Sequence, residues 1–194
     1  MSYHIYTTDG IILKRTAFGE ANIFLHILTE DLGLIVAGAR SARLSSSKLR
    51  PALQEYTYIS VSCVKGKNGW KITNVVEKEN FFFNYPNFSH KILSQISSVL
   101  LKMIPGESPH KEIFQIVKSG FEFLKTLQEK DVLNFETLVV LRILHQLGYV
   151  ESGPEINFFL KNREEWNVSI LEEVSQSRGN IIFTINKALK ESQL

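Results

Sequence analysis

A stretch of thirteen residues, Gly38 to Arg50, is the part of the sequence best suited to binding a polyanion. It reads GARSARLSSSKLR and contains four cationic side chains and no acidic one. Cations held on a loop can follow a nucleic-acid backbone, because each phosphate that they neutralise releases condensed counterions. We call residues 40–50 the basic arm, and the sequence predicts backbone contacts from its cations, Arg40, Arg43, Lys48 and Arg50.

Two further groups of cations accompany the basic arm. Within residues 40–71, seven Lys and Arg side chains face one acid, Glu55, so the positive charge is local although the net charge of the whole chain is only +2. The sequence predicts a second cluster on the next hairpin, from Lys65, Lys67 and Lys71, and a third from Lys14 or Arg15. Neighbouring residues of a strand point to opposite faces, so only one of that last pair easily joins a given groove.

Aromatic side chains lie between these cations in the sequence. If Ile59, Val61 and Cys63 point into a core, the twofold period of a strand places Tyr58 on the opposite face. Tyr58 and Trp70 are therefore candidates for stacking on bases. The plainer interpretation stays open, since a cationic loop is often only solvated and an aromatic residue of a small barrel often lies in its core.

Motifs of catalysis and of metal binding are missing from the sequence. Gly33 and Gly38 have the spacing of a phosphate-binding loop, but Ala39 and Arg40 occupy its Lys and Ser/Thr positions, and the residues between the glycines suit a buried strand. Cys63 is predicted to be a small core residue and not a nucleophile. The histidines have no metal-ligand spacing: His4, His26, His90, His110 and His145. We therefore expect no enzyme, metal or cofactor.

The first 80 residues have the pattern of a small barrel. Residues rich in Tyr, Thr and Ile alternate with turn signals, and Asn68-Gly69 is a strong hairpin signal. Asp9-Gly10 is expected to form a turn or a bulge. The predicted strands are His4 to Thr16, Ala21 to Thr29, Leu34 to Ala37, Leu53 to Val64 and Trp70 to Lys78. Five strands in this length fit an OB-fold barrel.

After the aromatic cluster at residues 81–86 the apolar residues recur at helical spacing. One helix is predicted over 88–103, a second from Ser108-Pro109 to Leu127, and a third from an Asp131 cap to Gly148. Shorter helices are expected near 169–175 and at the carboxyl end. The predicted fold is α+β, with an OB-fold domain at 1–80 and an all-α domain at 81–194. One cysteine leaves no zinc module, and we expect a cytoplasmic protein without a membrane span or secretion signal.

Several short motifs occur in the order and spacing that is typical of the bacterial RecO family. The resemblance covers the first 80 residues well and the helical part more loosely. In the first 80 residues the motifs are Gly10-Ile-Ile-Leu-Lys-Arg15, Phe18-Gly-Glu-Ala-Asn22, Thr29 with Gly33, Ala37-Gly-Ala-Arg40 and Leu53-Gln-Glu-Tyr-Thr57. In the helical part they are Phe135-Glu136 and Leu147-Gly-Tyr149.

The resemblance implies a recombination mediator in DNA repair that cleaves no bond. Such a protein binds single- and double-stranded DNA, anneals complementary strands, acts with RecR, and recognises the acidic tail of the single-strand-binding protein to help load recombinase. It would act at the nucleoid. Many members carry a four-cysteine zinc module that this chain lacks, and Pro51 and Tyr56 also depart from the family pattern. A protein-interaction adaptor and an RNA-binding OB module remain the alternatives.

Overall fold

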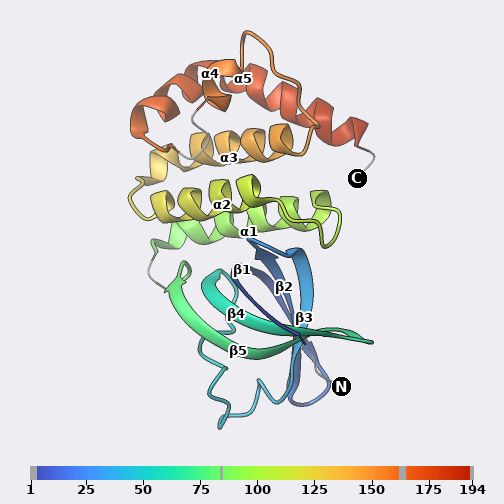
Figure 1. Ribbon diagram of the computed structural model, residues 1–194. Helices are drawn as coiled ribbons and strands as arrows, with labels where there is room; N and C mark the ends of the chain where they lie inside the picture. The colour runs from blue at the N-terminus through green and yellow to red at the C-terminus, as the bar shows by residue number, and fades with distance from the viewer. Residues whose placement is uncertain (1–3, 84, 162–164, 193–194) are drawn as a thin grey trace. The chain divides into compact units, whose positions relative to one another are not determined.

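A computed structural model describes residues 4–83, 85–161 and 165–192 of the chain (Figure 1). The chain divides into two compact units, which we call the barrel unit and the helical unit. The barrel unit comprises Met1–Asn84 and Pro105–Phe114, and the helical unit comprises Tyr85–Ile104 and Gln115–Leu194. The sequence predicted one boundary after residue 80 and did not indicate that residues 105–114 group with the barrel.

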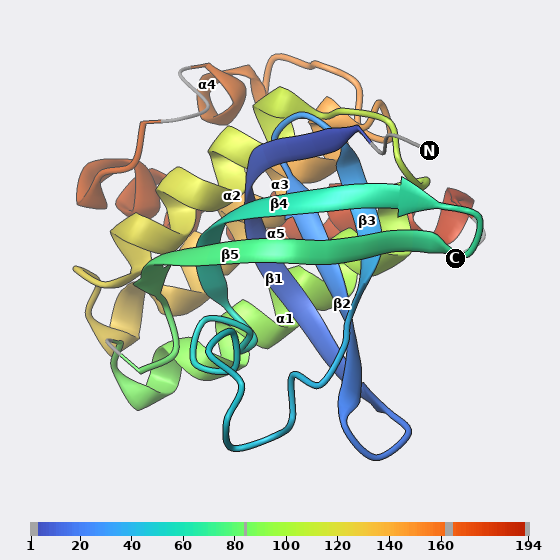
Figure 2. The same cartoon turned by 60° about the horizontal axis from the view of Figure 1, so that its bottom comes forward.

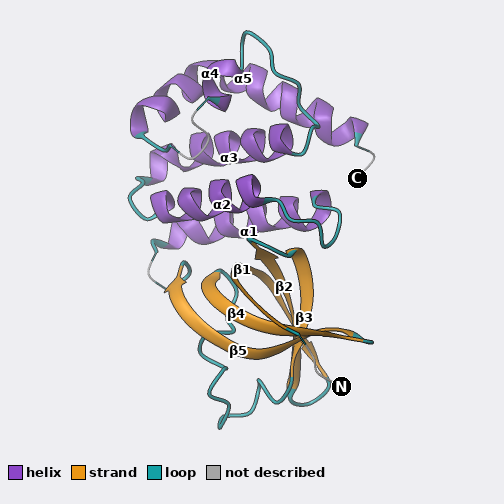
Figure 3. Ribbon diagram, viewed as in Figure 1, coloured by secondary structure: helices purple, strands orange, loops and turns teal. Residues whose placement is uncertain are grey.

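Five strands form a closed barrel in the order β1-β2-β3-β5-β4. The strands are β1 Ile5–Phe18, β2 Asn22–Thr29, β3 Gly33–Ala39, β4 Thr57–Gly66 and β5 Gly69–Asn80 (Figure 3). All neighbouring pairs are antiparallel except β3 and β5, which pair in parallel where Ala37 faces Trp70 and Gly38 faces Lys71. This topology confirms the predicted five-stranded OB-type barrel followed by helices.

The barrel core comes from alternate residues of each strand. On β4, Ile59, Val61 and Cys63 are fully buried while the residues between them are half-buried, which confirms the predicted inward parity. The core continues through β1, β2 and β3 with Ile12, Leu25 and other aliphatic side chains. The predicted start of β4 at Leu53 is wrong, because Tyr56 has a left-handed backbone, φ +61°, that breaks the extended chain before Thr57.

Strand β1 runs without a turn through Asp9-Gly10, contrary to the expectation at this dipeptide. The glycine serves close packing instead, because a Cβ on Gly10 would lie 2.7 Å from Cγ2 of Ile27. The irregularity of β1 lies farther along, between Ile12 and Lys14, where the register against β2 shifts.

The burial of Cys63 leads to a testable prediction. Burial raises the pKa of this thiol to about 11. The folded state thus holds the thiol proton more tightly than the unfolded chain does. The contribution of this group to the free energy of unfolding is therefore fully present below the ordinary pKa of 9.0, and it is lost as the pH rises toward 11. We expect Ellman's reagent to leave the native protein unmodified at pH 8 and to react at once in denaturant. Rapid reaction of the native protein would contradict the inward position.

The observed helices depart from the predicted helices at several places. The helices are α1 Asn87–Met103, α2 Lys111–Leu124, the 3-10 turn η1 Glu129–Asp131, α3 Val132–Gln146, α4 Asn157–Leu160 and α5 Val168–Glu191. Ser108-Pro109 does not start α2, which begins at Lys111, and the two short carboxyl-terminal helices are one helix of 24 residues. Asp131 stands at the start of α3 but its side chain makes no capping hydrogen bond, whereas Gly148 follows the end of the helix as predicted, with φ +81°.

A fully buried arginine holds part of the helical unit together. Arg142 of α3 donates from Nε to the carbonyl oxygen of Phe159 at 3.0 Å and from Nη1 to that of Glu165 at 3.1 Å. Its guanidinium carbon lies 4.4 Å from the centroid of the Trp166 ring, a cation–π distance. Trp166 in turn donates from Nε1 to the hydroxyl of Ser119 at 2.9 Å. Arg142 therefore links α3 to the chain around residues 159–166.

Residues 105–114 are fastened to the barrel by hydrogen bonds and ion pairs. Leu34 N donates to the carbonyl oxygen of Gly106 at 3.2 Å, and Lys111 Nζ lies 2.9 Å from Asp31. Gly33 has φ +74°, and a Cβ there would clash with the Ser108 carbonyl. We call residues 105–114 the strap. Among the described residues, none of the helices is long and apolar enough to cross a membrane.

Candidate nucleic-acid interface

Two exposed phenylalanines lie on the outer face of β1, β2 and β3. In the strand register Thr16 lies opposite Phe24, which lies opposite Gly38, and paired residues share a face. Phe18, at the end of β1, is 57% exposed, and its ring centroid is 5.0 Å from that of Phe24. Glycine at position 38 leaves room for the Phe24 ring, because a Cβ there would already be 3.4 Å from Phe24 Cε1.

Cations surround this aromatic pair. Lys14 lies opposite His26 on the same outer face, Lys71 pairs with Gly38 across the parallel β3–β5 ladder, and Arg40 follows β3. Burial and the charge of Lys14 lower the pKa of His26, so this histidine is neutral at pH 7 and adds no charge. We call the face formed by Lys14, Phe18, Phe24, Arg40 and Lys71 the platform.

A groove of about 220 Å³ runs over the platform. Its walls include Phe18, Phe24, Arg40, Asn68 and Lys71, so it lies between the β1–β2 turn and the β4–β5 turn. OB-folds bind oligonucleotides on the face of strands 2 and 3 and with these two loops. The groove combines aromatic faces with cations, the pair of features by which single strands are bound without regard to sequence.

The basic arm is built on the barrel core and carries its cations outward. Ala42 and Leu53 are buried in the core, and Leu49 packs against it. Backbone bonds at 3.1–3.3 Å from Leu44, Ser47 and Arg50 to the third residue before each fold the arm into tight turns. The four cations, Arg40, Arg43, Lys48 and Arg50, are exposed.

The arm also touches the β1–β2 turn next to the platform. Arg43 N donates to the carbonyl oxygen of Ala21 at 2.9 Å, and Arg43 Nη1 donates to that of Gly19 at 3.0 Å. Ser41 N donates to Asn22 Oδ1 at 3.0 Å. In Figure 2 the arm and the β1–β2 turn project from the same end of the barrel. The cations of the arm therefore continue the positive surface of the platform.

Neither Tyr58 nor Trp70 belongs to the exposed aromatic pair of the platform. Tyr58 is on the outer face as expected, but its hydroxyl donates to Asp9 Oδ2 at 2.5 Å and Lys78 Nζ lies 5.0 Å from its ring centroid. Burial, and then the hydrogen bond to Asp9, raise the pKa of Tyr58. Trp70 is 6% exposed and belongs to the barrel core, and it also forms part of the lining of the platform groove. In this conformation neither ring presents a free face to a base.

The remaining predicted cations separate into different environments. Lys65 forms an ion pair with Glu107 of the strap, and its hydrogen bond lowers the pKa of that carboxyl. Lys67 is exposed at the β4–β5 turn. Arg15 is half-buried and lies opposite Leu25, a core residue, so it faces away from the neighbouring Lys14. Lys14, Arg40 and Lys71 thus meet on one face, and Lys65 and Arg15 do not join them.

Phe18 and Phe24 were not among the predicted site residues. In the sequence Phe18 lies between two predicted strands, and Phe24 lies within the second of them. The available signal was the strand parity of β1, because Lys14, Thr16 and Phe18 alternate with Arg15 and Ala17, which lie opposite the core residues Leu25 and Ile23. The residues from Gly33 to Gly38 lie in β3. This confirms that they form a strand and not the phosphate-binding loop that the spacing of the two glycines suggests.

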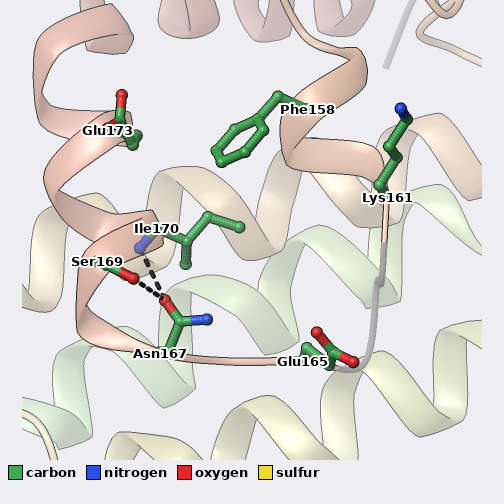
Figure 4. A pocket seen from close by; sticks show the side chains of 7 residues that line it. All are labelled: Phe158, Lys161, Glu165, Asn167, Ser169, Ile170 and Glu173. Atoms are coloured by element: carbon green, nitrogen blue, oxygen red, sulfur yellow. Dashed lines mark hydrogen bonds between the residues drawn. The ribbon is translucent and has the colours of Figure 1, made fainter.

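The helical unit contains a pocket of a different character. Figure 4 shows this pocket of about 360 Å³, in which Asn167 Oδ1 accepts from Ile170 N at 2.8 Å and from the Ser169 hydroxyl at 2.7 Å. Glu165 and Glu173 line it with one cation, Lys161, so its charge does not suit a phosphate backbone. Within the described part of the chain, no three His, Cys, Asp or Glu side chains are grouped to hold a metal ion.

Comparison with known proteins connects this geometry to a family. The family model for the amino-terminal part of recombination protein O matches residues 1–80, the stretch that builds the barrel. The chain is 30% identical over 149 residues to the DNA repair protein RecO of Dehalococcoides mccartyi, an alignment that covers 75% of this chain and 57% of that protein. The chain is therefore similar to RecO proteins, most clearly over the residues that build its barrel.

Other RecO proteins are similar over a longer part of the chain. The DNA repair protein RecO of Thermodesulfovibrio yellowstonii is 26% identical over 181 residues, 91% of this chain and 68% of that protein. The RecO of Heliobacterium modesticaldum is 27% identical over 159 residues, 80% of this chain and 55% of that protein. The chain thus spans between about half and two thirds of the length of these RecO relatives.

Proposed function

We propose that this protein binds single- and double-stranded DNA through the platform and the basic arm and acts in DNA repair by homologous recombination. The observation that carries the proposal is the exposed pair Phe18 and Phe24 among the cations Lys14, Arg40 and Lys71. Its position on the ligand-binding face of an OB-type barrel supports a nucleic-acid ligand. Similarity to proteins named DNA repair protein RecO supports DNA as that ligand.

The proposed activity is annealing of complementary strands without any change of a covalent bond. Two polyanions must approach each other for their bases to pair, and the arm cations screen the repulsion between their phosphates. The aromatic faces of Phe18 and Phe24 stack on bases and hold a strand with its pairing edges accessible. No general acid, base or nucleophile is part of this mechanism.

The proposal extends to recombinase loading with two protein partners. These are RecR and the acidic tail of the single-strand-binding protein, and similarity to RecO proteins is the support for both. Work on chromosomal DNA would place the protein at the nucleoid. We assign neither partner to a surface of the described structure.

The experiment that tests DNA binding compares the native protein with a Phe18→Ala/Phe24→Ala double variant. Binding of a labelled single-stranded oligonucleotide is followed by fluorescence anisotropy across a salt series. Loss of stacking costs about 1–3 kcal/mol per base, so we expect binding to weaken by at least about tenfold. The slope of log affinity against log salt should stay the same, because no cation is removed. Phe158→Ala removes an equally exposed phenylalanine, 57%, of the helical unit and serves as the control.

Three outcomes would contradict the proposal. Native binding that does not respond to salt would favour the protein-interaction adaptor, since a mostly apolar docking surface is nearly independent of salt. Much tighter binding of the ribose than of the deoxyribose oligomer would favour an RNA-binding module. Equal affinity of the double variant and the Phe158→Ala control would remove the platform from the site.

A further inference from the structure

A second aromatic pocket opens at the far end of the basic arm. It has a volume of about 300 Å³ and is lined by Arg15, Gln54, Glu55, Tyr56, Phe82 and Phe83. The platform does not use any of these six residues. The rings of Tyr56 and Phe82 are nearly parallel at 21°, with centroids 6.2 Å apart, and Phe83 stands edge-on to Phe82 at 5.6 Å.

The aromatic residues of this pocket are held outward by a buried side chain. Asn80 is buried, and its Oδ1 accepts hydrogen bonds from Phe82 N at 3.0 Å and from Phe83 N at 2.9 Å. Its Nδ2 donates to the Thr57 hydroxyl at 3.0 Å, which fixes the amide. The result is that Phe83 remains 73% exposed on an ordered turn. A turn whose backbone is fixed in advance loses less conformational entropy when its exposed ring stacks on a ligand.

The polar wall of the pocket suits an anion beside an aromatic ring. Glu55 Oε1 accepts from Arg15 N at 2.8 Å, so this carboxylate is already engaged with the backbone. The Nε of Arg15 is buried and has no hydrogen-bond partner within the described structure. A guanidinium is suited to bind a phosphate, and aromatic faces beside it are suited to bind a base.

The basic arm connects this pocket with the platform. It begins at Arg40, which lines the platform groove, and it ends at Arg50, four residues before Gln54 and Glu55, which line the second pocket. The exposed cations Arg43, Lys48 and Arg50 lie between the two ends. The chain between the two aromatic sites therefore carries exposed cations that suit a polyanion.

We propose that the second pocket binds a nucleobase of the same DNA strand that lies on the platform, with the base stacked on Phe83 and the adjoining phosphate at Arg15. This inference rests on the proposed function. The strand passes from the platform along the arm cations and ends in the pocket. The ligand is a base of single-stranded DNA, because only an unpaired base exposes its face for stacking.

The test is a length series of labelled oligothymidylates from about 4 to about 16 nucleotides, the range of site sizes of OB-folds. Binding is measured for the native protein, Phe83→Ala, Phe24→Ala and the control Phe183→Ala, whose ring is 71% exposed in the helical unit. We expect Phe83→Ala to bind the longer oligomers roughly 5- to 100-fold more weakly and the shortest like the native protein. Phe24→Ala should weaken binding at every length.

The outcomes separate the two proposals. If Phe24→Ala weakens binding and Phe83→Ala matches Phe183→Ala at all lengths, the second pocket is not part of the DNA path, and docking of a protein segment explains its exposed rings instead. If Phe83→Ala weakens binding equally at every length, even the shortest oligomers contact Phe83. The proposed path, which starts on the platform and ends in the second pocket, would then be wrong. If neither variant differs from the control, the platform proposal fails together with the inference. Circular dichroism verifies that each variant is folded.

Discussion

Replacing Arg142 with alanine should lower the unfolding free energy of the helical unit by about 3–5 kcal/mol. The change removes charge-assisted hydrogen bonds to the carbonyl oxygens of Phe159 and Glu165 and leaves both without these donors. It also removes the cation that lies 4.4 Å from the centroid of the Trp166 ring and opens a cavity in a fully buried position. The unfolding is measured in urea, with Trp166 fluorescence as the probe of the helical unit in a Trp70→Phe background.

Two further variants make this result specific. Lys187→Ala removes an exposed cation whose ion pair with Glu191 is 3.9 Å long, and it should cost less than about 0.5 kcal/mol. Arg142→Lys keeps the charge but loses the planar fork that reaches two carbonyls, so its stability should lie between those of the native protein and the alanine variant. A cost of Arg142→Ala equal to that of Lys187→Ala would show that the buried guanidinium is dispensable.

Replacing the four cations of the basic arm with alanine should reduce the salt dependence of single-strand binding. Each phosphate contact contributes about −0.7 to the slope of log affinity against log salt, so four contacts make the slope shallower by about 3. The same change should weaken binding near physiological salt by roughly two orders of magnitude. The variant is Arg40→Ala/Arg43→Ala/Lys48→Ala/Arg50→Ala, measured by anisotropy beside the native protein.

A matched control separates the position of these charges from their number. Lys102, Lys130, Lys187 and Lys190 are four exposed lysines of the helical unit, and their replacement by alanine also takes the net charge from +2 to −2. This control should bind with a nearly native slope. If both variants lose affinity and slope equally, the protein binds DNA through its overall charge and the arm is not the site.

The barrel and its core could be predicted because the information is local. The alternation of Ile59, Val61 and Cys63 is visible within one strand, and burial follows from it. Helix α5 was harder to predict, because residues 175–180 are polar and include Gly179, which reads as a break. The helix nevertheless continues through this stretch, because apolar residues on either side of it are buried, among them Leu171, Val174 and Ile181.

The site could be predicted only in part. Charges are visible in a sequence wherever they fall, so the arm cations were found without a structure. The place of Trp70 depends on the closure of the barrel, since its pairing with Ala37 across parallel strands turns it inward. The ion pair that engages Lys65 depends on the strap, because the strap places Glu107 beside Lys65. Glu107 lies about forty residues farther along the chain, so this pairing is not visible in the sequence around Lys65.

The strap also affects the order of events during synthesis. The five strands of the barrel have all left the ribosome when residue 80 has emerged, but the hydrogen bond from Leu34 to Gly106 and the pairing of Asp31 with Lys111 need about thirty residues more. Domains generally fold in order as they are made. Here α1, the first helix of the helical unit, must emerge before the barrel can acquire its last contacts. The nascent chain therefore completes its amino-terminal barrel only after it has begun its second unit.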